Sequence, residues 1–293
     1  MADDTVWIVD DSGERLSFAR PVRRVVSLVP AMTELLFAIG AGDRVAGRTR
    51  FDRHPPEALA VPSVGDGIRP NLERILALEP ELVVLFRGPD NRGVAEELRR
   101  LGVRTLAVRH STLADLARNT RRLGQVTGCT GGARRLAART SRALEEVRGV
   151  TAPLPRRRVY YDVWPSPPIT VGAGSYLDSL LTLAGGRNVF GRLRGASPQV
   201  SLEAIVARRP ELIVRPLDSA SASPAPLERP GWRALEPVRQ GRVRPVDADL
   251  VHRLGPRIGE AAAELALAIH PEIGGRLPGK ARAAPAFSCG PGS

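Results

Sequence analysis

The sequence predicts an α/β protein made of two similar lobes joined by one long helix. Residues 72–84 (LERILALEPELVV) and 202–214 (LEAIVARRPELIV) share Leu, Glu, Ile, Ala, Pro, Glu and Leu at matching positions. Each copy follows a residue that commonly caps helices, Asn71 or Ser201. Short apolar runs alternate with helical segments in each half, which is typical of sheets covered by helices. Two lobes favour a ligand site between them, because clefts at domain boundaries are common pockets.

The first lobe is expected to span residues 21–127, after a lead-in over residues 1–20 that forms a short hairpin or an extended segment around Ser12-Gly13. Pro30 precedes its first helix, and Gly102 follows a later one as a usual helix stop. We expect strands at 24–28, 45–47, 82–86 and 103–108, helices at 31–39, 71–78, 94–101 and 111–127, and a loop over 48–70.

The two lobes are expected to be joined by a helix within residues 128–152. Residues 131–150 are rich in Ala and Arg, contain no proline, and place Leu136, Leu144 and Val147 at helical spacing. Prolines 153 and 155 then end the segment.

The second lobe is expected over residues 153–273, followed by a tail at 274–293. The tail is rich in Gly, Pro and Ala, and we expect it to be disordered. We expect strands at 158–163, 212–214 and 243–246, a rigid turn at 164–168, helices at 176–184, 202–208, 232–235 and 256–270, and a loop at 216–230.

Composition and charge favour a globular protein over a nucleic-acid binder. The 293 residues carry a net charge of +12, but this charge is almost all arginine, since Lys280 is the single lysine. The arginines are spread along the chain, and aromatic residues make up only 4%. We therefore expect a solvated basic surface, with attraction to acidic substrates or anionic membranes as the alternative, and no nucleic-acid partner.

The two cysteines, Cys129 and Cys289, form neither a disulfide framework nor a metal motif. Because Cys289 falls in the expected disordered tail, we expect no bridge between them. No apolar run reaches the length of a transmembrane helix, and the start MADDTVWIVDDSGERLSF lacks the features of an export signal. The chain as written is therefore expected to be cytoplasmic, unless its true start lies upstream.

The sequence offers no catalytic motif and no divalent-metal site. It lacks the G-x-S-x-G, Walker, G-x-G-x-x-G and H-E-x-x-H patterns, so we expect no enzyme and no cofactor. The four histidines, His54, His110, His252 and His270, are not paired at helical spacing, which argues against a protein-bound metal. One alternative stays open, in which His252 coordinates a metal held inside a bound macrocycle.

Several segments resemble the vitamin B12 and ferric-siderophore family of ABC-transporter substrate-binding proteins. The S-x-x-P-x-x-T-E-L motif from Ser27, the N-L-E-R-I helix from Asn71 and the P-x-V-S-L-E helix from Pro198 carry the resemblance. Further matching segments extend it over about residues 24–270. Within the family, VWPSPP (163–168) and AGGRNVF (184–190) are most similar to the cobalamin-binding branch.

The resemblance implies a monomeric binding protein of two α/β lobes bridged by a backbone helix, with ligand in the cleft between them. It further implies that the protein delivers ligand to an ABC permease, on which one glutamate from each lobe docks. These glutamates correspond to Glu73 and Glu203, and a carboxylate in the first turn of a helix is favoured by the helix dipole. The alternative is that both are ordinary first-turn carboxylates.

The resemblance also indicates which residues line the ligand cleft. A corrin ring is a broad disc edged with amides, which suits flat aromatic walls and a few polar groups. Trp164 and Trp232 are candidate walls, with lobe core as their alternative, and Asp249 is a candidate acceptor for ligand amides or a turn residue. The full set of candidates is Pro30, Ala31, Phe51, Phe86, Arg87, Trp164, Trp232, Asp249 and Arg253.

Three departures from the family pattern keep other ligands and roles open. Gly67 stands where some cobalamin binders have a tryptophan, and the loops of the first lobe are crowded with Arg48, Arg50, Arg53 and Arg69. Arginines suit carboxylate- or catecholate-bearing ferric chelates, so a ferric-siderophore or haem receptor is the first alternative to a cobalamin receptor. A cytoplasmic metabolite-binding protein of the same fold is the second, because family members that are exported begin with a signal peptide.

Overall fold

The computed structural model describes residues 5–217, 229–277, 287 and 289, and it confirms the α/β fold class. The chain divides into two compact units, each of which contains a four-stranded sheet. Unit 1 comprises residues 1–110, 114–139 and 283–293, and unit 2 comprises residues 111–113 and 140–282.

The sheet of unit 1 is parallel and has the order β4-β3-β5-β6. Its strands are β3 (Val25–Ser27), β4 (Val45–Gly47), β5 (Leu82–Phe86) and β6 (Thr105–Val108). The first four residues of β5 are fully buried, as expected for a central strand with both faces covered.

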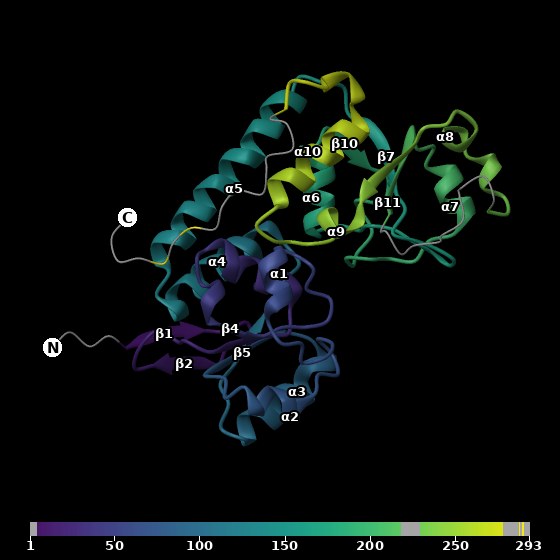
Figure 1. Cartoon of the computed structure of the whole chain (residues 1–293). Coiled ribbons are helices and arrows are strands. Elements are labelled where there is room, and N and C mark those ends of the chain that lie inside the picture. The colour runs from purple at the N-terminus through teal and green to yellow at the C-terminus, as the bar shows by residue number, and fades with distance from the viewer. Residues whose placement is uncertain (1–4, 218–228, 278–286, 288, 290–293) are drawn as a thin grey trace. The chain divides into compact units, whose positions relative to one another are not determined.

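Helices cover both faces of this sheet (Figure 1). Val83 and Leu85 of β5 pack against Ile75 of α2 (Leu72–Ala77) and Leu98 of α3 (Pro89–Arg100). In the figure α1 (Pro30–Ala38) and α4 (Leu113–Thr127) lie on the other side of the sheet. The apolar face of α1 is fully buried.

The lead-in forms the predicted hairpin, with β1 (Val6–Val9) antiparallel to β2 (Arg15–Phe18). A helix is also present in the predicted joining segment. It is α5 (Thr130–Thr151), which belongs to unit 1 up to Arg139 and to unit 2 from Thr140.

Unit 2 repeats the architecture with a parallel sheet of order β10-β7-β11-β12. Its core gathers Tyr160, Phe190, Ile205, Ile213 and Trp232. Its strands are β7 (Arg157–Tyr161), β10 (Gly186–Asn188), β11 (Leu212–Leu217) and β12 (Val243–Asp247). A separate small hairpin is formed by two strands of two residues each, β8 (Trp164–Pro165) and β9 (Pro168–Ile169). Its helices are α6 (Tyr176–Leu183), α7 (Leu202–Ala207), α8 (Glu236–Arg239), α9 (Ala248–Val251) and α10 (Ile258–Ile269).

The sequence repeat adopts the same local structure in both units. Asn71 and Ser201 cap α2 and α7 by accepting a hydrogen bond from the backbone N–H three residues later. After each helix a non-glycine residue takes a left-handed conformation, with φ of 44° at Glu79 and 46° at Arg209. These two positions differ by the same 130 residues as the repeat, so the sequence similarity extends to an uncommon backbone conformation.

The same arginine–glutamate arrangement holds each repeat at the start of its sheet. Arg24 donates to the carbonyls of Leu78 and Glu79, and Arg158 donates to the carbonyl of Arg209. The carboxylates of Glu81 and Glu211 accept from the backbone N–H groups of Arg24 and Arg158, respectively. The structure therefore explains why the repeated P-E-L segment is charged at its second position.

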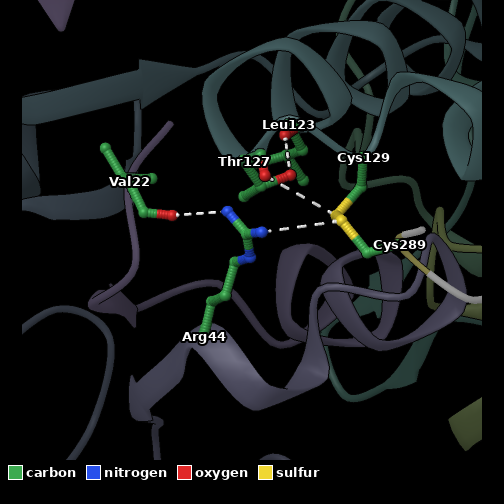
Figure 2. The surroundings of a disulfide bond; sticks show 6 residues. All are labelled: Val22, Arg44, Leu123, Thr127, Cys129 and Cys289. Atoms are coloured by element: carbon green, nitrogen blue, oxygen red, sulfur yellow. Dashed lines mark hydrogen bonds between the residues drawn. A yellow bond between two sulfur atoms is a disulfide. The ribbon is translucent and has the colours of Figure 1, made fainter. Parts of the chain in front are cut away.

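The expectation that the cysteines stay unpaired is wrong, because Cys129 and Cys289 form a disulfide (Figure 2). Cys129 lies between α4 and α5 and is 2% exposed. Arg44 donates to the carbonyl of Val22 at 2.9 Å and lies 3.7 Å from the Cys289 sulfur. The C-terminal segment is thus attached covalently to unit 1.

Phe287 is held beside this disulfide by two kinds of contact. Its ring lies 5.1 Å from the guanidinium of Arg135 and 5.0 Å from that of Arg139, one helical turn apart on α5. Its backbone N–H donates to the Ala38 carbonyl at 3.3 Å. Gly40 leaves room for the segment, since a Cβ there would lie 1.9 Å from the Phe287 carbonyl oxygen.

Most predicted elements are present, with differences at their ends. The predicted helix at 94–101 begins earlier, at Pro89, because Gly88 and Pro89 form a natural helix start. The rigid turn at 164–168 is a small hairpin, and β10, α8 and α9 were not predicted. Most of the predicted loop at 216–230 and of the tail at 274–293 lies outside the described residues. In the described part of the chain, no helix has the length and apolarity to cross a membrane.

Candidate functional site

The candidate residues of the first lobe lie just beyond the carboxyl ends of parallel strands, the usual binding edge of such sheets. Pro30 and Ala31 follow β3 and start α1, and Ala31 is only 4% exposed. Phe51 follows β4 and is 47% exposed, with the Arg50 guanidinium 5.0 Å from its ring. Phe86 ends β5 at 41% exposure, and Arg87 follows it.

A pocket of about 520 Å³ lies beside Phe86 and Arg87, entirely within unit 1. Four segments form it: the end of β5, one side of α3 from Pro89 to Arg99, Ala107 of β6 and the turn of the N-terminal hairpin. Its polar lining consists of Ser12, Arg87, Asn91, Arg92, Glu96 and Arg99. Of these, only Arg87 was predicted as a site residue.

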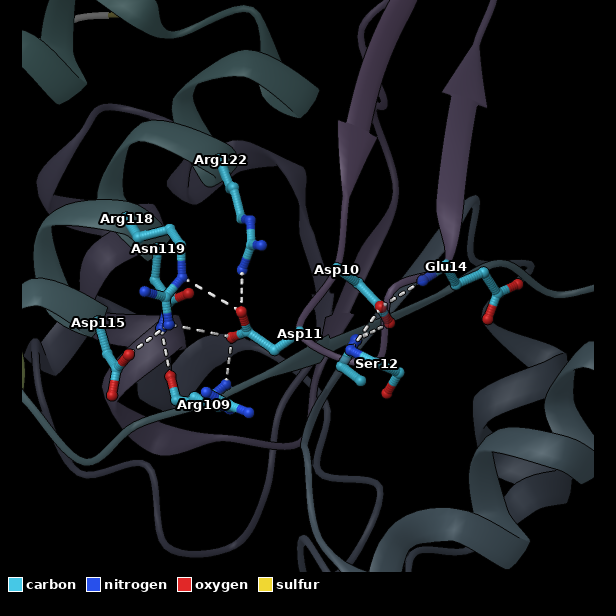
Figure 3. A network of polar contacts seen from close by, with 10 residues as sticks. Asp10, Asp11, Ser12, Glu14, Arg109, Asp115, Arg118, Asn119 and Arg122 are labelled. Atoms are coloured by element: carbon cyan, nitrogen blue, oxygen red, sulfur yellow. Dashed lines mark hydrogen bonds and ion pairs between the residues drawn. The ribbon is translucent and has the colours of Figure 1, made fainter.

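The hairpin turn is fixed against β6 by Asp10, which is 4% exposed (Figure 3). One carboxylate oxygen of Asp10 accepts from the N–H groups of Ser12 at 2.7 Å and Glu14 at 2.9 Å. The other oxygen accepts from the Ala107 N–H at 3.2 Å, and the Ala107 carbonyl accepts from the Asp11 N–H at 2.9 Å. The hairpin turn therefore has a defined position next to the carboxyl end of β6.

Asp11 anchors the same turn to α4. Its carboxylate lies 2.9 Å from Arg122 and 3.2 Å from Arg118, and it also accepts from the Arg109 backbone N–H. Burial raises the pKa of Asp11, but these hydrogen bonds and arginine charges outweigh it, so the pKa of this carboxyl is lowered. The aspartate is thus ionised at neutral pH and keeps both arginines on the hairpin.

His110 follows β6 at the same edge of the sheet. Burial lowers its pKa to about 4, against a smaller opposing effect of Asp115, so the ring is neutral at pH 7. The described residues contain no cluster of three or more histidine, cysteine or acidic side chains that could hold a metal ion. His252, the alternative ligand for a macrocycle-bound metal, is exposed and lies with its ring 6.0 Å from that of Tyr161.

In unit 2, Trp164 stands out as an exposed aromatic at the carboxyl end of β7. It belongs to the β8–β9 hairpin, is 57% exposed, and donates its indole N–H to the Ser166 carbonyl at 3.1 Å. This hydrogen bond orients the ring, and the backbone pairing with Ile169 fixes the strand that carries it.

Asp249 and Arg253 follow β12 on the same edge of the unit 2 sheet. They form an ion pair at 3.3 Å across one turn, and the Arg253 side chain is 16% exposed. Asp249 lines a pocket of about 480 Å³ whose other acidic residues are Asp247 and Glu264. The acidic oxygens of this pocket are suited to accept hydrogen bonds from amide or amine donors.

The structure does not support Trp232 as a ligand wall. The side chain is 3% exposed and packs in the core of unit 2, with its ring 6.0 Å from Tyr160 and 4.4 Å from the Arg229 guanidinium. Trp232 therefore occupies the position that the sequence analysis gave as the alternative to a ligand wall, the core of the lobe. Arg229 in turn forms a buried ion pair with Asp162 at 2.7 Å.

Glu73 and Glu203 are exposed and occupy the same position in the first turn of α2 and α7. The hydroxyl of Ser201, together with the glutamate's own backbone N–H, lowers the pKa of Glu203. The two helices thus present equivalent carboxylates to solvent, which the sequence repeat predicts.

The family model for periplasmic binding proteins matches residues 25–250, well over half of the chain. The chain belongs to the periplasmic binding protein family. The resemblance seen in the sequence is therefore confirmed. The N-terminal hairpin lies outside the matched residues.

Two relatives match most of this chain. The chain is 32% identical to a vitamin B12-binding protein of Salmonella typhimurium, over 84% of this chain and 90% of that protein. It is 30% identical to an uncharacterized ABC transporter substrate-binding lipoprotein of Bacillus subtilis, YvrC, over 91% of this chain and 86% of that protein.

Two solved structures are similar to this chain over most of its length. The periplasmic vitamin B12-binding protein BtuF of Vibrio cholerae has a TM-score of 0.73 and 26% identity, covering 86% of this chain and 98% of that one. The periplasmic haem-binding protein RhuT of Roseiflexus has a TM-score of 0.74 at 24% identity, covering 85% and 98%. The second similarity concerns the fold alone.

Proposed function

We propose that this protein is the substrate-binding component of an ABC uptake system and that it binds a cobalamin-like corrinoid without chemical change. The observation that carries the proposal is the set of exposed aromatic side chains at strand carboxyl ends: Phe51 and Phe86 in unit 1, and Trp164 in unit 2. Such flat apolar surfaces suit a macrocycle, and relatives over most of the chain are named vitamin B12-binding proteins. That one ligand contacts both units stays a prediction.

The acidic pocket of unit 2 fits the same ligand class. A corrin carries amide side chains, whose N–H groups require acceptors, and Asp249 offers a carboxylate at a pocket wall. Haem is the second candidate, because the arginines beside Phe86 suit its carboxylates.

We further propose that the protein works outside the cytoplasm. Disulfides form and persist in oxidising compartments and are rare in the cytosol, and Cys129 and Cys289 are bridged. Relatives named as a lipoprotein and as periplasmic proteins support the same location.

Changing Trp164 to alanine should weaken cyanocobalamin binding at least tenfold, because a flat apolar wall is lost from an exposed position. Trp7→Ala is the matched control, since Trp7 is 59% exposed and lies on β1, away from the strand ends. Calorimetric titration of both variants measures the effect. Equal affinities of the two variants would contradict a ligand role for Trp164.

Reversing both repeat glutamates, Glu73→Arg with Glu203→Arg, should abolish stimulation of the cognate permease while leaving ligand affinity unchanged. The control Glu57→Arg with Glu146→Arg adds the same charge at exposed sites of both units. ATP hydrolysis by the permease in liposomes reports docking. If the double reversal leaves stimulation at the level of the control, these glutamates are ordinary first-turn carboxylates.

A further inference from the structure

The 520 Å³ pocket of unit 1 has a wall that the family match does not include. Ser12, in the turn of the N-terminal hairpin, faces it, while the family model begins at residue 25. Asp10 and Asp11 hold this turn against β6 and α4 through the contacts described above (Figure 3). The wall is therefore a fixed part of unit 1.

The pocket is lined by more positive than negative side chains. Arg87, Arg92 and Arg99 line it together with one acidic residue, Glu96. Arg99 already has partners in the protein, since it forms an ion pair with Glu14 at 3.5 Å and donates to the Thr105 hydroxyl at 3.1 Å. Arg87 and Arg92 are exposed, as Arg99 is.

Arg92 occupies a position where a cation is normally unfavourable. It lies in the first turn of α3, where the helix dipole favours negative charge and where Asp90 already places one carboxylate. An anion bound between this helix end and the arginines would be stabilised by both.

Asn91 adds a second feature that points to a ligand. It lines the pocket, is 4% exposed, and donates from its side-chain amide to the Phe86 carbonyl at 3.1 Å. Its Oδ1 accepts no hydrogen bond from the described residues. The end of β5 is thus fixed beside the arginines. The Asn91 Oδ1 is an acceptor, so it suits an N–H or O–H donor of the ligand next to the anion, and not the anion itself.

We propose that this pocket binds an anionic oxygen group of the ligand, a carboxylate or a phosphate ester. Arg87 and Arg92 donate to the anion, and the hairpin turn at Ser12 limits its size. The proposal rests on the proposed function and extends it. The aromatic side chains contact the macrocycle, and this pocket binds the charged group at the edge of the macrocycle.

The test pairs each macrocycle with an analogue that lacks the anion. Cyanocobalamin carries a phosphate ester that dicyanocobinamide lacks, and haemin carries two carboxylates that its dimethyl ester lacks. Arg92→Gln should weaken an anion-bearing ligand about tenfold and leave its anion-free analogue unchanged. Arg121→Gln, an exposed arginine of α4, is the charge control and should change neither.

A second variant tests the hairpin wall. Ser12→Trp should fill the pocket and weaken the same ligand, while Val9→Trp, at an exposed position of β1, should not. A loss of affinity confined to cyanocobalamin, compared with dicyanocobinamide, identifies the anion as a phosphate ester. A loss confined to haemin, compared with its dimethyl ester, identifies it as a carboxylate. Equal losses for a ligand and its anion-free analogue, or no loss with either, would overturn the pocket and leave the proposed function standing.

If the wild-type protein binds none of the four macrocycles, the proposed function is overturned. A direct anion titration then tests the anion pocket by itself. Orthophosphate should then shift the backbone amide resonances of Ser12, Arg87 and Arg92, and Arg92→Gln should remove these shifts while Arg121→Gln retains them. Absence of the shifts in the wild-type protein would overturn the anion pocket.

Discussion

Removing the Cys129–Cys289 disulfide should lower the free energy of unfolding by about 5 kcal/mol. The bridge joins residues 160 apart in the sequence, and the loop entropy that such a crosslink removes from the unfolded chain corresponds to that magnitude. The closed loop contains all of unit 2 from Thr140 onward. Breaking the bridge therefore restores freedom to half of the unfolded protein.

Local contacts should add to this loss. Phe287 and its cation–π contacts with Arg135 and Arg139 depend on the attachment two residues later. The double variant Cys129→Ala with Cys289→Ala is compared with the wild type by urea unfolding, and Phe287→Ala measures the local part alone. A loss below 1 kcal/mol in the double variant would contradict a stabilising role for the bridge.

Neutralising one member of the buried Asp162–Arg229 pair should cost about 3–5 kcal/mol, because the remaining charge stays buried without its partner. The side chains are 1% and 6% exposed, and the two groups are 2.7 Å apart. Burial raises the pKa of Asp162, while Arg229 opposes that rise, so the carboxylate depends on the arginine to remain charged.

The comparison of single and double variants isolates this pair. Asp162→Asn and Arg229→Met should each destabilise unit 2, and the double variant should lose less than the sum of the two. Glu145→Gln is the matched control, since its pair with Arg148 is more than 60% exposed on both sides and should change stability by less than 1 kcal/mol. Additive losses in the double variant would show that the pair is not coupled.

The sequence was most informative where local patterns decide the structure. The repeat predicted α2 and α7 together with their caps at Asn71 and Ser201, because capping and apolar spacing act over a few residues. Parallel strands such as β5 were predicted at their observed bounds, since a buried apolar run between turn residues has few alternatives.

Contacts between distant residues could not be predicted in the same way. The disulfide joins segments 160 residues apart, and Asp11 meets Arg118 and Arg122 across more than a hundred residues. No local pattern encodes such a distance, so the pocket beside the hairpin was missed although Arg87 was included among the site residues. Trp232 was misplaced for the same reason: its burial depends on Tyr160 and Phe190, which are remote in sequence.

The most direct test of the proposed function is a titration of the oxidised full chain with cyanocobalamin, followed by calorimetry and by tryptophan fluorescence, with haemin in parallel. We expect saturable one-to-one binding of cyanocobalamin with micromolar or tighter affinity, and quenching of tryptophan fluorescence that disappears in Trp164→Ala. Failure of both macrocycles to bind would contradict the proposal that the exposed aromatic strand ends form a macrocycle receptor.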